Sequence, residues 1–186
     1  MSGTYPQVNL SEQTFKEAMS RFPSGVTVIM TEGEEGHSVG MTASAFISVS
    51  LSPPLVLESV AKTAQMHAHL MREERYSVSI LGAHQVAESN HFAGFGEASF
   101  TPTIVSVDQL PAVGGSLARV ACRIISRVDM GDHTLFIGQA QHVDLEDTDE
   151  PALIYARRDY HIHAPLSTSV STDDTTGDMS HFEESE

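Results

Sequence analysis

The residues between Gly40 and Met66 have types and spacing that could do chemistry. Thr42 to Ala45 sets hydroxyls beside small apolar side chains, so this backbone could lie along a flat ring with polar edges. Further along, Lys62 and Thr63 form a pair that can hold a phosphate. Lys62 is one of only two lysines in a chain of net charge −15. The combination of a ring-binding and a phosphate-binding segment suggests a flavin nucleotide site.

The elements around this segment are mostly short strands joined by turns. Apolar residues at helical spacing predict a first helix over residues 11–22, and Pro53-Pro54 separates two strand-like runs. The other predicted helices are 63–75 and 83–93. The predicted strands are 26–31, 37–50 (one long strand or two), 55–60, 76–81, 117–128, 133–143, 152–155 and 160–163, with an unassigned, loop-rich region over 95–115.

This order of elements predicts a mainly β fold with flanking helices, built as an antiparallel barrel. Strands and helices do not alternate regularly, which argues against a parallel dinucleotide-binding sheet. No GxGxxG motif follows the first strand, and Gly94-Phe95-Gly96 is too short to serve as one.

Composition divides the chain into three parts and narrows its function. We expect an N-terminal arm over 1–10, one folded domain over 11–165 and an acidic, disordered tail over 166–186, since that last segment is rich in Ser, Thr and Asp and holds no Lys or Arg. The acidic excess argues against nucleic acid, and no apolar run is suited to span a membrane. Cys122 is the only cysteine, which fits a cytoplasmic protein, and its apolar neighbours predict a core position.

Four segments in chain order carry a family resemblance: FKEAMSRFPSGVTVIMT, VGMTASAFISVSLSPPLVLESVAKT, NHFAG and GDHTLFIGQA. They resemble the flavin reductase-like family, the small reductase components of two-component flavin-dependent monooxygenases, over about Phe15 to Tyr160. The resemblance implies an FMN-binding split barrel that forms a homodimer. It also implies that NADH or NADPH reduces FMN or FAD, and that the reduced flavin passes to a partner monooxygenase.

The resemblance assigns roles to matching residues. His133 would lie near the nicotinamide and position it, rather than donate a proton. The residues matched to flavin binding are Thr42, Ala43, Ser44 and Ala45 for the ring and ribityl chain; Ser59, Ala61, Lys62 and Thr63 for the phosphate; Phe92 beside the flavin; and Tyr155 and Arg157 in a C-terminal segment that approaches it.

Several alternatives stay open at this point. Thr42 to Ala45 could be a strand of small residues at a close sheet contact. His67 with His69, and His161 with His163, form HxH pairs, but no carboxylate or cysteine stands at a recognised spacing, so we expect no metal site. The chain could also be a flavin-binding electron carrier or redox sensor, or a same-fold oxidase or monooxygenase. Residues 95–115 align poorly with the family, and the chain has no Trp, which leaves the choices between FMN and FAD and between NADH and NADPH open.

Overall fold

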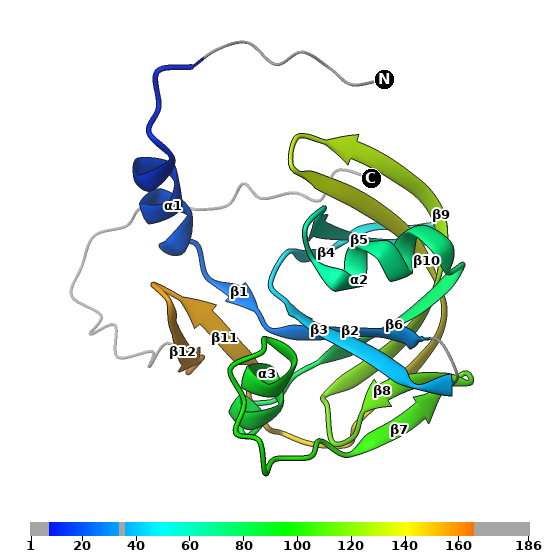
Figure 1. The fold of residues 1–186 in the computed structure, drawn as a ribbon. Coiled ribbons are helices and arrows are strands. Elements are labelled where there is room, and N and C mark those ends of the chain that lie inside the picture. The colour runs from blue at the N-terminus through cyan, green and yellow to red at the C-terminus, as the bar shows by residue number, and fades with distance from the viewer. Residues whose placement is uncertain (1–7, 34–35, 166–186) are drawn as a thin grey trace, which may run out of the picture.

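A computed structural model describes residues 8–33 and 36–165 of the chain. The described part is mainly β, with antiparallel sheets and three short helices around them (Figure 1). The predicted fold class is therefore confirmed. The predicted tail over 166–186, and the first seven residues of the predicted arm, lie outside the described residues.

Three helices and twelve strands follow one another along the described residues. The helices are α1 (Glu12–Ser20), α2 (Gln65–Arg72) and α3 (Val86–Phe92). The strands are β1 (Ser24–Gly25), β2 (Thr27–Glu32), β3 (Ser38–Ala43), β4 (Phe46–Leu51), β5 (Pro54–Ala61), β6 (Arg75–Ile80), β7 (Ile104–Val107), β8 (Leu110–Val113), β9 (Ala118–Met130), β10 (His133–Leu145), β11 (Leu153–Ala156) and β12 (Asp159–Ile162).

The main sheet is forced to curl by its own connectivity. Its seven strands run in the order β3-β2-β6-β9-β10-β5-β4. The two outermost strands, β3 and β4, are also consecutive in the chain and are joined by Ser44 and Ala45 alone. The sheet must therefore bend until its two edges meet, which gives a barrel with its seam at Ser44 and Ala45.

The barrel interior is apolar and is closed at one end by α2. Met66 and Leu70 of α2 are fully buried and join a core that includes Ile29, Val78 and Phe136. This burial is what holds α2 in place, because so short a helix is marginal in water without tertiary packing. Met71 follows Leu70 in the same helix but is 48% exposed.

Most predicted elements are confirmed within one to three residues of their ends. Ser11 caps α1 by accepting a hydrogen bond from the Thr14 amide at 3.0 Å. Cys122 is buried as predicted. The region left unassigned over 95–115 contains a hairpin of β7 and β8. Its turn residues, Asp108 and Gln109, have positive φ angles of 44° and 69° without the usual glycine, so the turn signal was absent.

One carboxyl group lies inside the barrel among apolar side chains. Glu58 on β5 is 0% exposed, and neither of its carboxyl oxygens has a hydrogen-bond partner among the described residues. Burial raises the pKa of Glu58 to about 8 from an ordinary value of 4.5. Tyr76 and Cys122 are a buried cross-strand pair on β6 and β9, and their pKa values are raised chiefly by burial and further by Glu58. Glu58 is thus protonated in the folded protein at neutral pH.

We expect Glu58 to make the protein less stable as the pH rises. The folded state keeps a proton on Glu58 that the unfolded chain loses above pH 4.5. The stability that depends on this proton is complete below pH 4.5 and is lost as the pH rises to about 8. The loss is on the order of 5 kcal/mol. Urea unfolding of the wild type and Glu58→Gln at several pH values measures it.

The variant should lack most of the wild-type decline in unfolding free energy between pH 5 and 8. Glu74→Gln, which changes a side chain 81% exposed, is the matched control and should keep the decline. A Glu58→Gln variant with the full wild-type decline would show that Glu58 is not the responsible group.

Candidate active site

The seam of the barrel is fixed by hydrogen bonds on both sides. The Thr27 hydroxyl donates to the Ala43 carbonyl at 3.0 Å, and the Thr42 hydroxyl donates to the Ser89 carbonyl of α3 at 2.6 Å. Across the seam, the Ser59 amide donates to the Ala45 carbonyl at 3.2 Å. The two segments that the sequence singled out, around Thr42 and around Ser59, are therefore adjacent and form one continuous surface.

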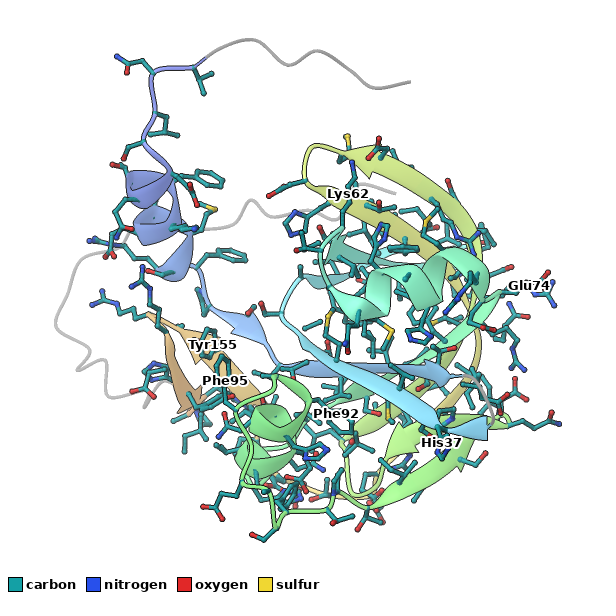
Figure 2. The ribbon with its side chains drawn as sticks, viewed as in Figure 1. His37, Lys62, Glu74, Phe92, Phe95 and Tyr155 are labelled. Carbon is teal, nitrogen blue, oxygen red and sulfur yellow. The ribbon has the colours of Figure 1, made fainter. Side chains whose placement is uncertain are left out.

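A pocket of about 390 Å³ opens on the β3 side of this seam. Phe95, from the loop after α3, and Tyr155, from β11, both line it and lie near each other in Figure 2. Residues that line it are Val26, Thr42, Ala43, Ser44, Ser89, Asn90, Ala93, Phe95, Tyr155, Arg158, Asp159 and Tyr160. Aromatic side chains opposite a ledge of small residues make this a slot suited to a flat ring.

The wall opposite the seam is held by Tyr160. Its hydroxyl lies 2.8 Å from the Ser89 hydroxyl and donates to Asn90 Oδ1 at 3.0 Å. The Tyr155 and Tyr160 rings meet edge-on with centroids 5.4 Å apart. Because Thr42 also bonds to Ser89, a single chain of contacts ties β3, α3 and β12 together around the pocket.

The other end of the surface carries positive charge. Lys62 Nζ donates to the Gly131 carbonyl at 2.7 Å and forms an ion pair with Asp129. A hydrogen bond from Lys62 holds the pKa of Asp129 below its usual range. An ammonium has three donors, so one remains for a ligand. Figure 2 shows Lys62 well apart from Tyr155, beside the β9–β10 hairpin.

The first turn of α2 lies next to Lys62 and lacks a cap. Ala64 occupies the N-cap position and provides no side-chain hydrogen bond, although Ser, Thr, Asp or Asn is preferred there. The helix start therefore presents amide groups that a phosphate can accept from. Lys62, Thr63 and this uncapped helix start are thus a candidate anion site.

His133 lies at the same end, at the start of β10. It is the cross-strand partner of Ala61 on one side and of Met130 on the other. Its Nδ1 is 2.8 Å from Asp132 Oδ1, and its side chain is 40% exposed. Hydrogen bonding from His133 lowers the pKa of Asp132. The carboxylate thus orients the imidazole ring with Nε2 left for a ligand.

Of the predicted site residues, Thr42, Ala43, Ser44 and Tyr155 line the pocket. The others do not: Ala45, Ser59, Ala61, Lys62, Thr63 and His133, and also Phe92 and Arg157, which were predicted beside the flavin. A Cβ on Gly40 would come within 2.5 Å of the Phe92 ring, and Phe92 packs against the core that includes Val28 and Met30. Phe95 lines the pocket instead. Arg157 lies at the turn between β11 and β12 and lines a neighbouring cleft, whereas the adjacent Arg158 lines both.

Sequence reasoning missed several pocket residues: Ser89, Asn90, Phe95, Arg158 and Tyr160. Their segments were predicted, but the pocket depends on how α3 and the β11–β12 hairpin dock against the seam. Tyr155 and Tyr160 are partners across that hairpin, and a symmetric tyrosine pair was the one local signal that could have pointed to Tyr160.

The described residues fit a flavin nucleotide. The hydroxyls of Ser44, Ser59 and Thr63 make no hydrogen bond with other residues in the part of the chain that the structure describes, so they are available along the surface from ring pocket to anion site.

Within residues 8–33 and 36–165, no three metal-binding side chains gather as a metal site would need, and none of the helices has the length and apolar character to cross a membrane.

Comparison with known proteins agrees with this geometry. The model of the flavin reductase like domain family matches residues 19–164. The chain belongs to the flavin reductase-like family. The predicted family is therefore confirmed.

Relatives in this family are similar over most of their length. The reductase component of 4-hydroxyphenylacetate 3-monooxygenase from Thermus thermophilus is 39% identical over 150 residues, which is 80% of this chain and 95% of the relative. An NADH-dependent flavin reductase from Rhodococcus is 40% identical, over 71% of this chain and 76% of the relative. The solved structure of flavin reductase PheA2 has a TM-score of 0.79 and 37% identity, and covers 83% of this chain and 99% of its own.

Removing the Lys62 charge should weaken binding of flavins that carry a phosphate. We expect Lys62→Ala to raise the dissociation constant of FMN about tenfold, the loss of one charge-assisted hydrogen bond. Riboflavin has no phosphate, so its dissociation constant should change less than about twofold. Quenching of flavin fluorescence measures both constants. Lys16→Ala, which removes the other lysine from an exposed pair with Glu12, is the control. Equal losses for FMN and riboflavin would contradict a phosphate role.

Proposed function

We propose that this protein is an NADH-dependent flavin reductase that supplies reduced flavin to a partner monooxygenase. The observation that carries the proposal is the continuous surface from the ring pocket beside Thr42 to the anion site at Lys62. The Ala45–Ser59 hydrogen bond, at 3.2 Å, joins the two parts. Relatives named as NADH-dependent flavin reductases and as a monooxygenase reductase component support the same reaction.

Each part of the surface has a distinct task in this proposal. Thr42 to Ala45 lies along the ring, and Ser44 and Ser59 offer hydroxyls to the ring edge and the ribityl chain. Lys62, Thr63 and the start of α2 hold the phosphate. Bound flavin supplies N5 as the acceptor of hydride from the nicotinamide.

In this proposal the side chains position the flavin and the nicotinamide and exclude water, and none of them is a reacting group. Phe95 and Tyr155 hold two flat rings against each other, because hydride transfer depends chiefly on stacking and distance. His133 is oriented by Asp132 at 2.8 Å. It positions the nicotinamide from the end of the surface where the flavin phosphate lies. Tyr155 closes the far side of the pocket.

The proposed reaction predicts NADH oxidation that depends on added flavin. Purified protein with NADH and FMN under air should consume NADH, and His133→Asn should lower the rate at saturating substrate while leaving the FMN dissociation constant within about twofold. Loss of the nicotinamide absorbance measures the rate.

The outcomes separate the proposed function from its alternatives. Tightly bound flavin without NADH oxidation would instead support an electron carrier or redox sensor. An oxidised organic product formed by this protein alone would support an oxidase or monooxygenase. Either result would overturn the reductase assignment.

We also propose a homodimer, because an apolar surface lies on the outside of the barrel. Ile47, Leu57 and Ile137 are register neighbours on β4, β5 and β10. Their side chains point away from the interior that holds Glu58 and Phe136. Ile47 is 57% exposed, and Leu51 at the end of β4 is 92% exposed. A monomer rarely leaves such a row open to water.

A charge in this row should separate the dimer. The wild type should show twice the chain mass by light scattering at micromolar concentration, and Ile47→Asp should show the mass of one chain. Met71→Asp puts a charge on an exposed residue of α2 and should remain dimeric. A monomeric wild type would contradict the proposal.

A cytoplasmic location is also proposed, from the single buried thiol of Cys122.

A further inference from the structure

A second cationic cleft lies beside the ring pocket, on the side away from Lys62. Its volume is about 300 Å³, and its lining residues are Glu17, Ser20, Arg21, Arg157 and Arg158. Three of the chain's ten basic residues meet here, in a protein of net charge −15. Glu17, whose carboxylate is 3.6 Å from Arg21, is the one acid in the lining.

The turn that carries two of these arginines has an unusual backbone. Arg157 and Arg158 have φ angles of 52° and 65°, a region that glycine and asparagine prefer in two-residue hairpin turns. A long side chain at both positions is disfavoured there, and such strain gathers at functional sites. The Arg157 amide donates to the Ser20 carbonyl at 2.5 Å, which fixes the turn against the end of α1.

The guanidinium groups of this turn are available to a ligand. Neither Arg157 nor Arg158 forms a side-chain hydrogen bond or ion pair with another residue in the described part of the chain. Asp159, the acid next to the turn, already accepts the Tyr160 amide at 2.8 Å. Planar guanidinium groups with open donors match the oxygens of a phosphate or diphosphate.

The cleft and the ring pocket are continuous, because Arg158 lines both. Lys62 lines neither the pocket nor the cleft, and Figure 2 shows it well apart from Tyr155 of the pocket wall, so the Lys62 site and the arginine cleft are separate. Two nucleotides with stacked rings repel each other least when their phosphates leave in opposite directions. The flavin phosphate would occupy the Lys62 end, which leaves the arginine end for the second nucleotide.

We propose that the cleft of Arg21, Arg157 and Arg158 binds the diphosphate of the nicotinamide dinucleotide. The inference rests on the proposed reductase function and adds the site at which the reductant is held. It makes Arg157 a contact of the dinucleotide rather than of the flavin ring. The chemistry recognised is a nucleotide diphosphate, which FAD also carries, so the test must separate these two sources.

The test measures binding of ADP-ribose, which has the diphosphate but no reactive ring, so no turnover is needed. Arg21→Gln and Arg157→Gln should each weaken ADP-ribose binding in calorimetry and raise the KM for NADH about tenfold. The FMN dissociation constant should stay within about twofold, which also shows that the variants fold. Arg123→Gln is the charge-matched control, because Arg123 pairs with Glu74 at 3.8 Å, far from Tyr155 in Figure 2.

Two kinds of outcome would overturn the assignment, and a third would separate it from the reductase function. A loss of FAD affinity with an unchanged KM for NADH would show that the cleft binds the diphosphate of FAD instead. ADP-ribose binding that is unchanged in Arg21→Gln and Arg157→Gln, or reduced equally in Arg123→Gln, would show that the arginines of the cleft do not bind the diphosphate. Their role would then be limited to the end of α1. If the protein binds ADP-ribose through these arginines but oxidises no NADH, the reductase function fails while the cleft assignment stands.

Discussion

The short link between β3 and β4 is the constraint on which the rest of the molecule depends. These strands are the two edges of the seven-stranded sheet, and only Ser44 and Ala45 join them. So short a link brings the two edges of the sheet together and creates the seam. The small side chains at the seam leave room for a ligand where a larger residue would fill the space. Fold closure and ligand site are thus the same feature.

Charge follows the same geometry. Basic side chains stand at two places near the seam, at Lys62 and in the arginine cleft, in a protein of net charge −15. Each place is fixed by a backbone carbonyl: Gly131 accepts from Lys62, and Ser20 at the end of α1 accepts from the Arg157 amide. This charge pattern is consistent with the proposed binding of two nucleotides, one at each basic site.

Much of the fold could be predicted from local patterns, and the site only in part. The strands and the segments around Thr42 and Lys62 have clear signals, because alternation and the Lys-Thr pair are local. The β7–β8 hairpin escaped prediction because Asp108 and Gln109 turn without glycine. Phe95, Arg158 and Tyr160 reach the pocket through the docking of α3 and β12, which no local pattern encodes. Glu58 lies in a strand that reads as apolar, and its burial follows from the closed barrel.

A crystal structure of the protein with FMN tests the central claim most directly. The account predicts the flavin ring in the pocket beside Thr42 to Ala45, the ribityl chain passing Ser59, and the phosphate within hydrogen-bond distance of Lys62 Nζ and the first amides of α2. A phosphate bound by Arg157 and Arg158, with Lys62 still paired only to Asp129 and Gly131, would contradict it.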